Sequence, residues 1–285
     1  MTTLTYVALG DSLTAGVGDR VAGGWRGWAA LLAASLGAPG HRVRFHNLAA
    51  NGAQTHDVLR HQAPAALALR PDLASVVVGV NDTLRRTFDL HAVAARLDEV
   101  YGALRAGGAV LLTACLPDPG AMLGLPGPLR RPLARRQRGV NTVVHALSAR
   151  HGALHLHVAG EEWVRDRALW SVDRLHPGER GHRVLAARFH ALLAAEGLAS
   201  GPAPGHAPEE PGPTPTESLW WLATAGTGWV ARRCTDLLPQ LVGLAATEVR
   251  HWVCGTSGGL DARAARAAAV ALDGATAAER HAEAA

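Results

Sequence analysis

The sequence is short of the features that mark secreted, membrane-spanning and metal-cluster proteins. It has three cysteines, Cys115, Cys234 and Cys254, which allow at most one internal disulfide and show no CxxC spacing, so we expect reduced, structural thiols. There is no run of about 18 apolar residues. The start of the chain also lacks the charged segment, apolar stretch and small-residue cleavage site of a secretory signal. These absences lead us to expect a cytoplasmic protein.

What the chain does contain is an ordinary globular balance of residues. Of its 285 residues, 48% are hydrophobic and 18% are charged, which excludes disorder throughout. The formal net charge of +4 comes almost entirely from arginine.

One dense basic run interrupts this even distribution. It consists of Arg130, Arg131, Arg135, Arg136 and Arg138. The run could face phosphates or an anionic membrane, but a solvated loop and helix start explains it as well. No aromatic residues interleave with it, so we expect no nucleic-acid partner.

Short apolar runs alternate with longer Ala- and Leu-rich segments over residues 1–199, which predicts a parallel sheet covered by helices. The predicted strands are 5–9, 42–47, 73–80, 109–113 and 153–157. The predicted helices lie near 25–36, 55–63, 90–106, 134–150 and 178–196. Residues 1–199 therefore form an α/β domain of five β-α units.

The remainder of the chain has a different composition. Residues 200–216 carry six prolines and three glycines, which predicts an extended linker. Residues 217–254 are rich in Leu and Ala and hold four of the eight tryptophans, and we expect a helical segment there with Thr216 as its N-cap. Residues 255–285 are Ala-rich and poor in large apolar side chains, so we expect them to fray or to be disordered.

A serine stands at the carboxyl end of the first predicted strand, in Gly10-Asp11-Ser12-Leu13-Thr14-Ala15-Gly16. Ligands bind at that edge of open α/β sheets, so Ser12 is a candidate nucleophile. Taken without partners, the same motif is more typical of a polar turn whose serine caps the next helix.

A carboxylate and an imidazole stand three residues apart just before the last predicted helix, as Asp173 and His176. A turn of this length lets the carboxylate accept the Nδ1 proton while Nε2 points toward a nucleophile. The alternative is an N-terminal helix cap by Asp173, and Pro177 suits the first position of a helix in either case.

Two further segments follow predicted strands at the same sheet edge. They are Asn51-Gly52 after the second strand and Gly79-Val80-Asn81-Asp82 after the third. A glycine N–H and an asparagine amide are neutral donors suited to a developing oxyanion, although both residues are also common in turns. The residues alone do not separate Asn81 from Asn51, but the convergence of serine, donors and imidazole favours a catalytic site.

The four blocks, in this order, resemble those of the SGNH or GDSL hydrolases over residues 5–196. Gly10-Asp11-Ser12 resembles the nucleophile block, Asn51-Gly52 the glycine block, Gly79-Val80-Asn81-Asp82 the Gly-x-Asn-Asp block, and Asp173-Arg174-Leu175-His176-Pro177 the Asp-x-x-His block. The resemblance implies a flavodoxin-like three-layer α/β/α fold with a five-stranded parallel sheet of order 2-1-3-4-5. In this chain, a C-terminal helical extension would follow that domain.

The same resemblance implies an esterase or lipase-like activity on a small-molecule ester, with no cofactor and no metal. Ser12 would attack the ester carbonyl, His176 would take and return the proton, and Asp173 would orient His176. The backbone N–H groups of Ser12 and Gly52 and the side chain of Asn81 would form the oxyanion hole.

Fifteen histidines raise the alternative of a metal site. His155 and His157 would share one face of a predicted strand, but zinc needs three or four convergent ligands. No third ligand at a suitable spacing accompanies them, so we expect no metal.

Other functions stay open at this stage. A carbohydrate O-deacetylase or a lysophospholipase would use the same site and differ in loops such as 117–131. In a different class of function, the segment 217–254 would dock a partner or a membrane through its tryptophans, next to Arg232 and Arg233. Burial of these tryptophans on the hydrolase domain is favoured over that role.

Overall fold

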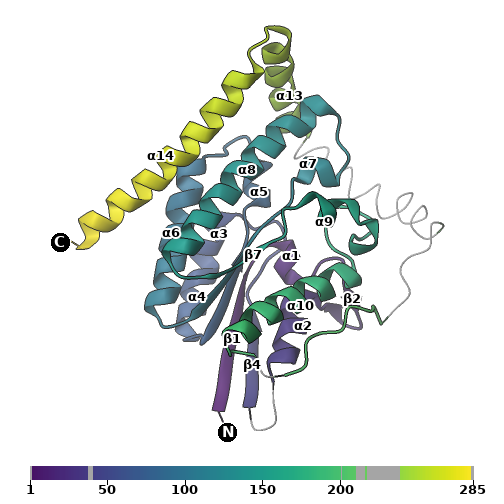
Figure 1. Ribbon diagram of the computed structural model, residues 1–285, viewed down its shortest axis with the longest axis vertical. Coiled ribbons are helices and arrows are strands. Elements are labelled where there is room, and N and C mark those ends of the chain that lie inside the picture. The colour runs from purple at the N-terminus through teal and green to yellow at the C-terminus, as the bar shows by residue number, and fades with distance from the viewer. Residues whose placement is uncertain (1, 38–40, 200, 210–215, 217–237, 284–285) are drawn as a thin grey trace.

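A five-stranded parallel sheet forms the middle layer of the protein (Figure 1). The computed structural model describes residues 2–37, 41–199, 201–209, 216 and 238–283. The strands of the sheet are β1 (Thr2–Gly10), β4 (His41–Asn47), β5 (Leu73–Val77), β6 (Val110–Cys115) and β7 (Leu154–His157). Their spatial order is β4-β1-β5-β6-β7, which is 2-1-3-4-5 along the chain and confirms the predicted fold. A short antiparallel pair, β2 (Arg20–Val21) and β3 (Gly24–Trp25), stands apart from this sheet.

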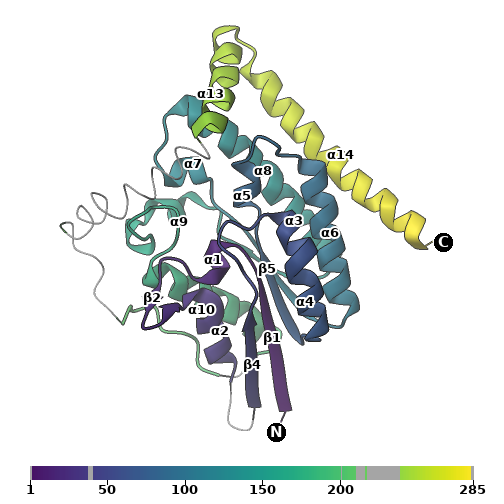
Figure 2. The same ribbon diagram turned by 180° about the vertical axis from the view of Figure 1, so that it is seen from behind.

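Helices cover both faces of the sheet, as Figures 1 and 2 show from opposite sides. On one face, α2 (Gly27–Leu36) packs beside α10 (Glu179–Ala195). On the other face lie α4 (Ala63–Ala68), α6 (Leu90–Ala106) and α8 (Gly127–Arg150). The connecting helices are α1 (Ser12–Ala15), α3 (Thr55–Asp57), the π-helical η1 (Val58–Gln62), α5 (Val80–Thr83), α7 (Pro119–Met122), α9 (Glu161–Arg165) and the 3₁₀-helical η2 (Arg167–Leu169).

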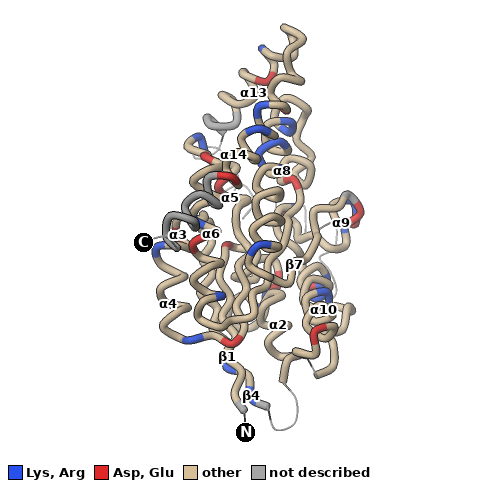
Figure 3. Tube along the Cα trace, turned by 60° about the vertical axis from the view of Figure 1, so that its left-hand side comes forward, with Lys and Arg blue, Asp and Glu red and all other residues tan. Residues whose placement is uncertain are grey.

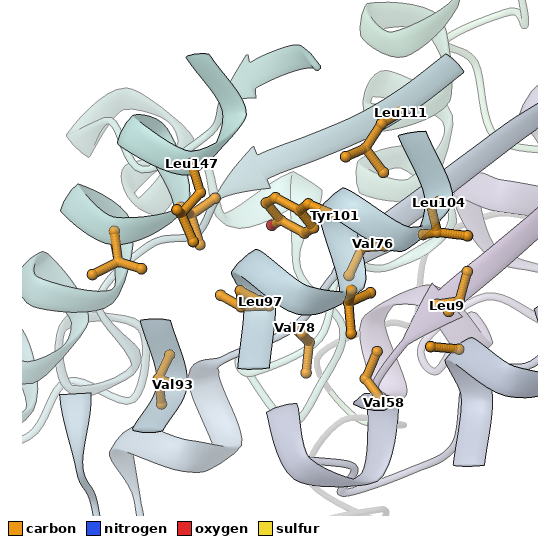
Figure 4. Close-up of a cluster of buried hydrophobic side chains, with 14 of the residues drawn as sticks. Leu9, Val58, Val76, Val78, Val93, Leu97, Tyr101, Leu104, Leu111 and Leu147 are labelled. Carbon is orange, nitrogen blue, oxygen red and sulfur yellow. The ribbon is translucent and has the colours of Figure 1, made fainter. Parts of the chain in front are cut away.

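Helix α6 illustrates how the sequence pattern builds this architecture. Its apolar residues recur every three or four positions, so one face is buried: Leu90, Val93, Ala94, Leu97, Val100, Tyr101 and Leu104. Asp89 caps the helix by accepting hydrogen bonds from the N–H groups of His91 and Ala92. Figure 4 shows Leu97 and Tyr101 in the core formed with β5 and β6. Each fully buried leucine contributes about 1.5–3 kcal/mol, so this face holds α6 firmly on the sheet.

Two C-terminal helices pack against the outer side of α6 and α8 (Figures 1 and 2). They are α13 (Leu238–Val253) and α14 (Ser257–Glu283). Arg135 of α8 bonds to Glu248 of α13 at 3.0 Å and to Asp261 of α14 at 2.9 Å, and Arg138 also reaches Asp261. In Figure 3 the blue arginine positions gather where α8 passes α13. Arg135, which is 13% exposed, therefore holds the C-terminal helices instead of facing solvent, whereas Arg138 stays 65% exposed.

Helix α14 overturns the expectation that residues 255–285 fray or are disordered. The expectation rested on the lack of large apolar side chains. Alanine has the highest helix propensity, and its small side chain allows two helices to approach closely. Ala268 and Ala271 are only 6% and 3% exposed, in the same core cluster as α6. Small residues therefore supply the contact that we had expected only from large ones.

The linker and the Trp-rich segment are only partly within the described residues. Residues 201–209 form no helix or strand, and Glu209 pairs with Arg26 and Arg183, so this stretch lies on the hydrolase domain. Residues 217–237, with three of the four tryptophans, lie outside the described residues. The fourth, Trp252 on α13, is 63% exposed. Within the described residues, no helix combines the length and apolarity needed to cross a membrane.

Candidate active site

Ser12 lies at the first position of α1, immediately beyond the end of β1. The preceding Gly10 has φ +148°, and a Cβ atom there would lie 2.2 Å from the Val77 carbonyl oxygen of β5. Only glycine fits this approach of two strands. Asp11 caps α1 by accepting a hydrogen bond from the N–H of Leu13 at 3.0 Å. This tight strand-to-helix turn presents the serine hydroxyl at the carboxyl edge of the sheet.

A hydrogen-bonded chain joins Ser12 to the turn before α10. The hydroxyl of Ser12 donates to Nε2 of His176 at 2.7 Å, and Nδ1 of His176 donates to Oδ2 of Asp173 at 2.6 Å. The carboxylate is an acceptor only, which fixes the proton of the imidazole on Nδ1 and leaves Nε2 free to accept. The structure thus brings together the three residues that the sequence predicts, although Ser12 and His176 are separated by 164 positions.

The turn itself holds Asp173 in the ionised form. Its Oδ1 accepts hydrogen bonds from the N–H groups of Leu175 and His176 and from the hydroxyl of Ser171. Burial alone would raise the pKa of Asp173, but the bond to His176, its charge and the two N–H groups lower that pKa to about 2. A carboxylate that stays charged is suited to stabilising an imidazolium.

His182 ties the two sides of the site to each other. Nδ1 of this buried histidine accepts from the N–H of Trp28 at 3.1 Å, and its Nε2 donates to the Val17 carbonyl at 3.0 Å. Both bonds require the neutral ring. Burial is the largest of the causes that lower the pKa of His182 to about 4. The helix that follows His176 is thereby fixed to the segment that follows Ser12.

The predicted oxyanion-hole donors belong to three segments, namely the start of α1, the loop after β4 and α5. The N–H of Ser12 is at the start of α1, where no helical carbonyl can accept it. The Nδ2 of Asn81 donates to the Ala53 carbonyl at 3.1 Å and to Oδ2 of Asp11 at 3.3 Å. The first of these bonds holds the segment containing Gly52, whose φ is +78°, against Asn81. Asn81 lines the same pocket as Ser12 and His176, whereas Gly52 lines a neighbouring hollow.

Two supporting interactions were not predicted from the sequence, one made by Gln62 and one by Asp82 of the Gly-x-Asn-Asp block. Gln62 of η1 accepts from the N–H of Gly10 at 2.8 Å and donates to its carbonyl at 2.9 Å. Asp82 accepts from both the N–H and the hydroxyl of Thr55. Neither interaction leaves a local sequence signal, since the partners are 52 and 27 positions apart. They fix the two loops that carry Ser12 and Gly52.

Asp11 is a further buried carboxyl group beside the serine, with an exposed fraction of 3%. Burial raises the pKa of Asp11 to about 6, while the N–H of Leu13 and the charge of His176 act in the opposite direction. The N-cap position in the nucleophile block is the signal that could have identified it.

The pocket next to Ser12 has a mainly apolar wall and a cavity of about 50 Å³. The wall-forming residues beyond the polar group are Leu13, Val80, Leu116, Pro117, Met122, Val158, Trp163, Trp170, Leu175, Pro177 and Leu185. Pro117 and Met122 belong to the segment 117–131, which was expected as a loop but forms α7 and the start of α8. The two tryptophans were not predicted, because nothing in the sequence places the 163–170 segment over the sheet edge.

Comparisons with known proteins agree with this geometry. Residues 8–184 match the model of the GDSL-like lipase/acylhydrolase family. No curated protein matches the chain.

Solved structures share the fold. Axe2, an acetylxylan esterase from Geobacillus stearothermophilus, has 20% identity and a TM-score of 0.55, over 67% of this chain and 94% of that one. LAE5, an alpha/beta hydrolase enzyme from the metagenome of Lake Arreo in Spain, has 23% identity and a TM-score of 0.55, over 70% and 99%. TesA has 25% identity and a TM-score of 0.54, over 67% and 98%. Since the family model covers more than half of the chain, the protein belongs to the GDSL-like lipase/acylhydrolase family and is a carboxylic ester hydrolase.

Proposed function

We propose that the protein hydrolyses short-chain carboxylic esters through an acyl-enzyme formed on Ser12, with His176 as general base and acid and Asp173 as its orienting carboxylate. The observation that carries this proposal is the continuous chain from Oδ2 of Asp173 through the imidazole to Oγ of Ser12, with separations of 2.6 and 2.7 Å. Both are within the range required for proton transfer between a nucleophile and its base.

The reaction follows from the proton positions. As Oγ of Ser12 bonds to the ester carbonyl carbon, its proton passes to Nε2 of His176, and the carbonyl oxygen becomes an oxyanion. When the carbon–oxygen bond to the alcohol breaks, His176 returns the proton to the leaving alkoxide. A water then loses a proton to His176 and attacks the acyl-serine, which releases the carboxylic acid and restores the hydroxyl of Ser12.

Three neutral donors would stabilise the oxyanion, namely the N–H groups of Ser12 and Gly52 and the amide of Asn81. The support is the Asn81 amide, whose bond to the Ala53 carbonyl at 3.1 Å fixes the side chain with one N–H. Its second N–H forms a longer bond of 3.3 Å to Oδ2 of Asp11, which the oxyanion would replace. In enzymes where one such donor was removed, the loss was about 2.7–4 kcal/mol.

The pocket favours a small acyl group. On the scale on which one water needs about 10–15 Å³, a cavity of about 50 Å³ holds a group of only a few heavy atoms. Its apolar wall suits the hydrocarbon part of an acetyl or propionyl group. An acetylated sugar would present the same acyl group, whereas a lysophospholipid would need room for a long chain.

The test is hydrolysis of a series of p-nitrophenyl esters of increasing acyl length by the wild-type chain, Ser12→Ala and the matched control Ser257→Ala on α14. We expect Ser12→Ala to lose about 10⁴-fold or more in rate, because the oxyanion donors alone leave residual catalysis. Ser257→Ala should keep the wild-type rate. Equal rates for Ser12→Ala and wild type would refute the assignment of the nucleophile.

The same series reports the substrate class. A maximum at acetyl or propionyl esters supports the small-acyl pocket, and an added arm with acetylated xylooligosaccharides distinguishes a sugar deacetylase. A rate that rises steadily toward long acyl chains would contradict the short-chain proposal and favour a lysophospholipase.

A further inference from the structure

A second cluster of reactive side chains lies on the edge strand β7, away from the serine. Cys115, His155 and His157 offer ligand atoms that all lie within 4.8 Å of one another. Thr113 and Cys115 of β6 pair in register with His155 and His157 of β7. Because alternate side chains of a strand share a face, the pairing brings the thiol and both imidazoles to one side of the sheet.

Helix α8 adds a third imidazole to this cluster. The ring of His145 lies 5.3 Å from that of His155 and 5.1 Å from that of His157, between centroids, and the two strand histidines are 4.7 Å apart. The thiol of Cys115 is 3.1 Å from Nε2 of His155. Three secondary-structure elements therefore place one thiol and three imidazoles together.

A buried chain of hydroxyl groups fixes the ring of His155. Ser148 donates to the Val144 carbonyl at 2.6 Å, so its oxygen accepts from Thr113 at 2.7 Å. Thr113 has then used its own proton and must accept from Nδ1 of His155 at 2.9 Å. This polarity leaves the lone pair of Nε2 directed toward the thiol. Metal-binding histidines are typically held in this way, with the second ring nitrogen donating to a fixed acceptor.

The cluster is also open to solvent on one side. His145 and His157 are exposed, which opens a route for an ion from solvent.

We propose that Cys115, His155, His157 and His145 form a binding site for Zn²⁺. Tetrahedral zinc with a thiolate and an imidazole places sulfur and nitrogen about 3.6 Å apart. The 3.1 Å contact of Cys115 with His155 has to lengthen only slightly, and a rotation of the exposed His145 ring supplies the fourth ligand. On binding, the thiol proton is released to solvent and Zn²⁺ takes its place, which leaves a site of net charge +1.

The site is directly connected to the ester pocket through the backbone. Leu116 follows Cys115, and Val158 follows His157, and both line the pocket beside Ser12. Strand β7 is at the edge of the sheet, and among the described residues β6 is the one strand that pairs with it. A zinc ion shared by β6, β7 and α8 would therefore act as a structural clamp on one wall of the pocket.

The experiment uses the full, untagged chain, treated with a chelator, incubated with Zn²⁺ and desalted before metal analysis. We expect one zinc per chain and a melting temperature that rises with zinc concentration, because a ligand that binds only the folded state stabilises it. Cobalt replaces zinc in a parallel arm, where thiolate coordination gives a sulfur-to-cobalt charge-transfer absorption.

Four variants decide whether the ion occupies this site. Cys115→Ser and His157→Gln should each weaken zinc binding by at least about 100-fold, and Thr113→Val should weaken it by about 10–100-fold through the lost partner of His155. Cys254→Ser, which changes the exposed cysteine at the end of α13, is the matched control and should bind zinc and cobalt as wild type does.

Metal-free melting curves of all variants show whether each one folds. Retention of no zinc by the folded wild-type chain would overturn the proposal. Zinc affinity and cobalt absorption unchanged in both Cys115→Ser and His157→Gln would overturn it equally, since the ion would then be bound elsewhere.

Discussion

The forces that hold the sheet domain together differ from those that attach the C-terminal helices to it. In the sheet domain, large side chains such as Trp28, Leu97 and Tyr101 are essentially without exposure. At α13 and α14, the buried apolar residues are alanines, and the strongest fixed contacts join arginines of α8 to Glu248 and Asp261.

This difference predicts two kinds of response to damage. Apolar burial contributes about 25 cal/mol per Å² and is little affected by moderate salt, whereas ion pairs near the surface are screened as ionic strength rises. Loss of a core side chain should therefore unfold the catalytic site with the domain. Loss of an ion pair should loosen the C-terminal helices and leave the catalytic site intact.

The largest expected effect compares two tryptophans, one in each region. Trp28 is fully buried and stacks on Phe189 at 4.7 Å between ring centroids, so Trp28→Ala should lower the free energy of unfolding by about 3–5 kcal/mol. Trp252→Ala, at an exposed site on α13, should change it by less than about 0.5 kcal/mol. Urea denaturation of both variants gives the comparison. Similar losses would show that the two regions are not held as differently as their contacts indicate.

A smaller effect is expected from Glu248→Gln. The carboxylate is 2% exposed and its partner Arg135 13%, so removal of its charge leaves a largely buried arginine without full compensation. We expect a loss of up to about 3 kcal/mol in helix docking, limited because undocking returns Arg135 to water. Hydrogen exchange should become faster in α13 and α14, while ester turnover stays at the wild-type rate. A fall in turnover would mean that the docked helices support the catalytic site.

The smallest expected effect is on the pH dependence of stability, and it arises from a residue of the sheet domain. The pKa of His182 in the folded protein is about 4, below the ordinary 6.5. The neutral ring therefore contributes stability that is complete above pH 6.5 and is lost as the pH falls toward 4.

In His182→Gln, an amide can keep both bonds, to the N–H of Trp28 and the Val17 carbonyl, without titrating. Asp11, with its pKa raised to about 6, acts in the opposite direction over the same interval, so the measured quantity is the difference between variant and wild type. Wild type should lose about 1–3 kcal/mol more than the variant between pH 6.5 and 4. Parallel curves would remove His182 as the cause.

The features that the sequence predicted well are those with a local signature. The strands have short apolar runs, and Ser12 and the Asp173–His176 pair each occupy a defined place after a strand or before a helix. Asn81 was separated from Asn51 only by the resemblance to the hydrolase family. The order of blocks along the chain was then enough to bring them to one edge. The fold confirms this expectation for the sheet, and the geometry of the serine, imidazole and carboxylate follows from it.

What the sequence did not predict depends on contacts between distant residues. The docking of α14 requires that alanines meet α6 across a matching surface, and composition alone does not indicate such a match. Cys115 and His145 are 40 and 10 positions from His155, so no ligand spacing connects them. Trp163 and Trp170 reach the pocket only because of how the segment before Asp173 crosses the sheet edge.

The separation of Ser12 and His176 along the chain has a consequence for synthesis. Ser12 follows the first strand and leaves the ribosome early, whereas Asp173 and His176 follow the fifth strand. If Ser12 and His176 act as proposed, an incomplete nascent chain would hold the serine without its base and would not hydrolyse esters. Turnover would then report completion of the sheet, although not of α13 and α14, which follow it along the chain.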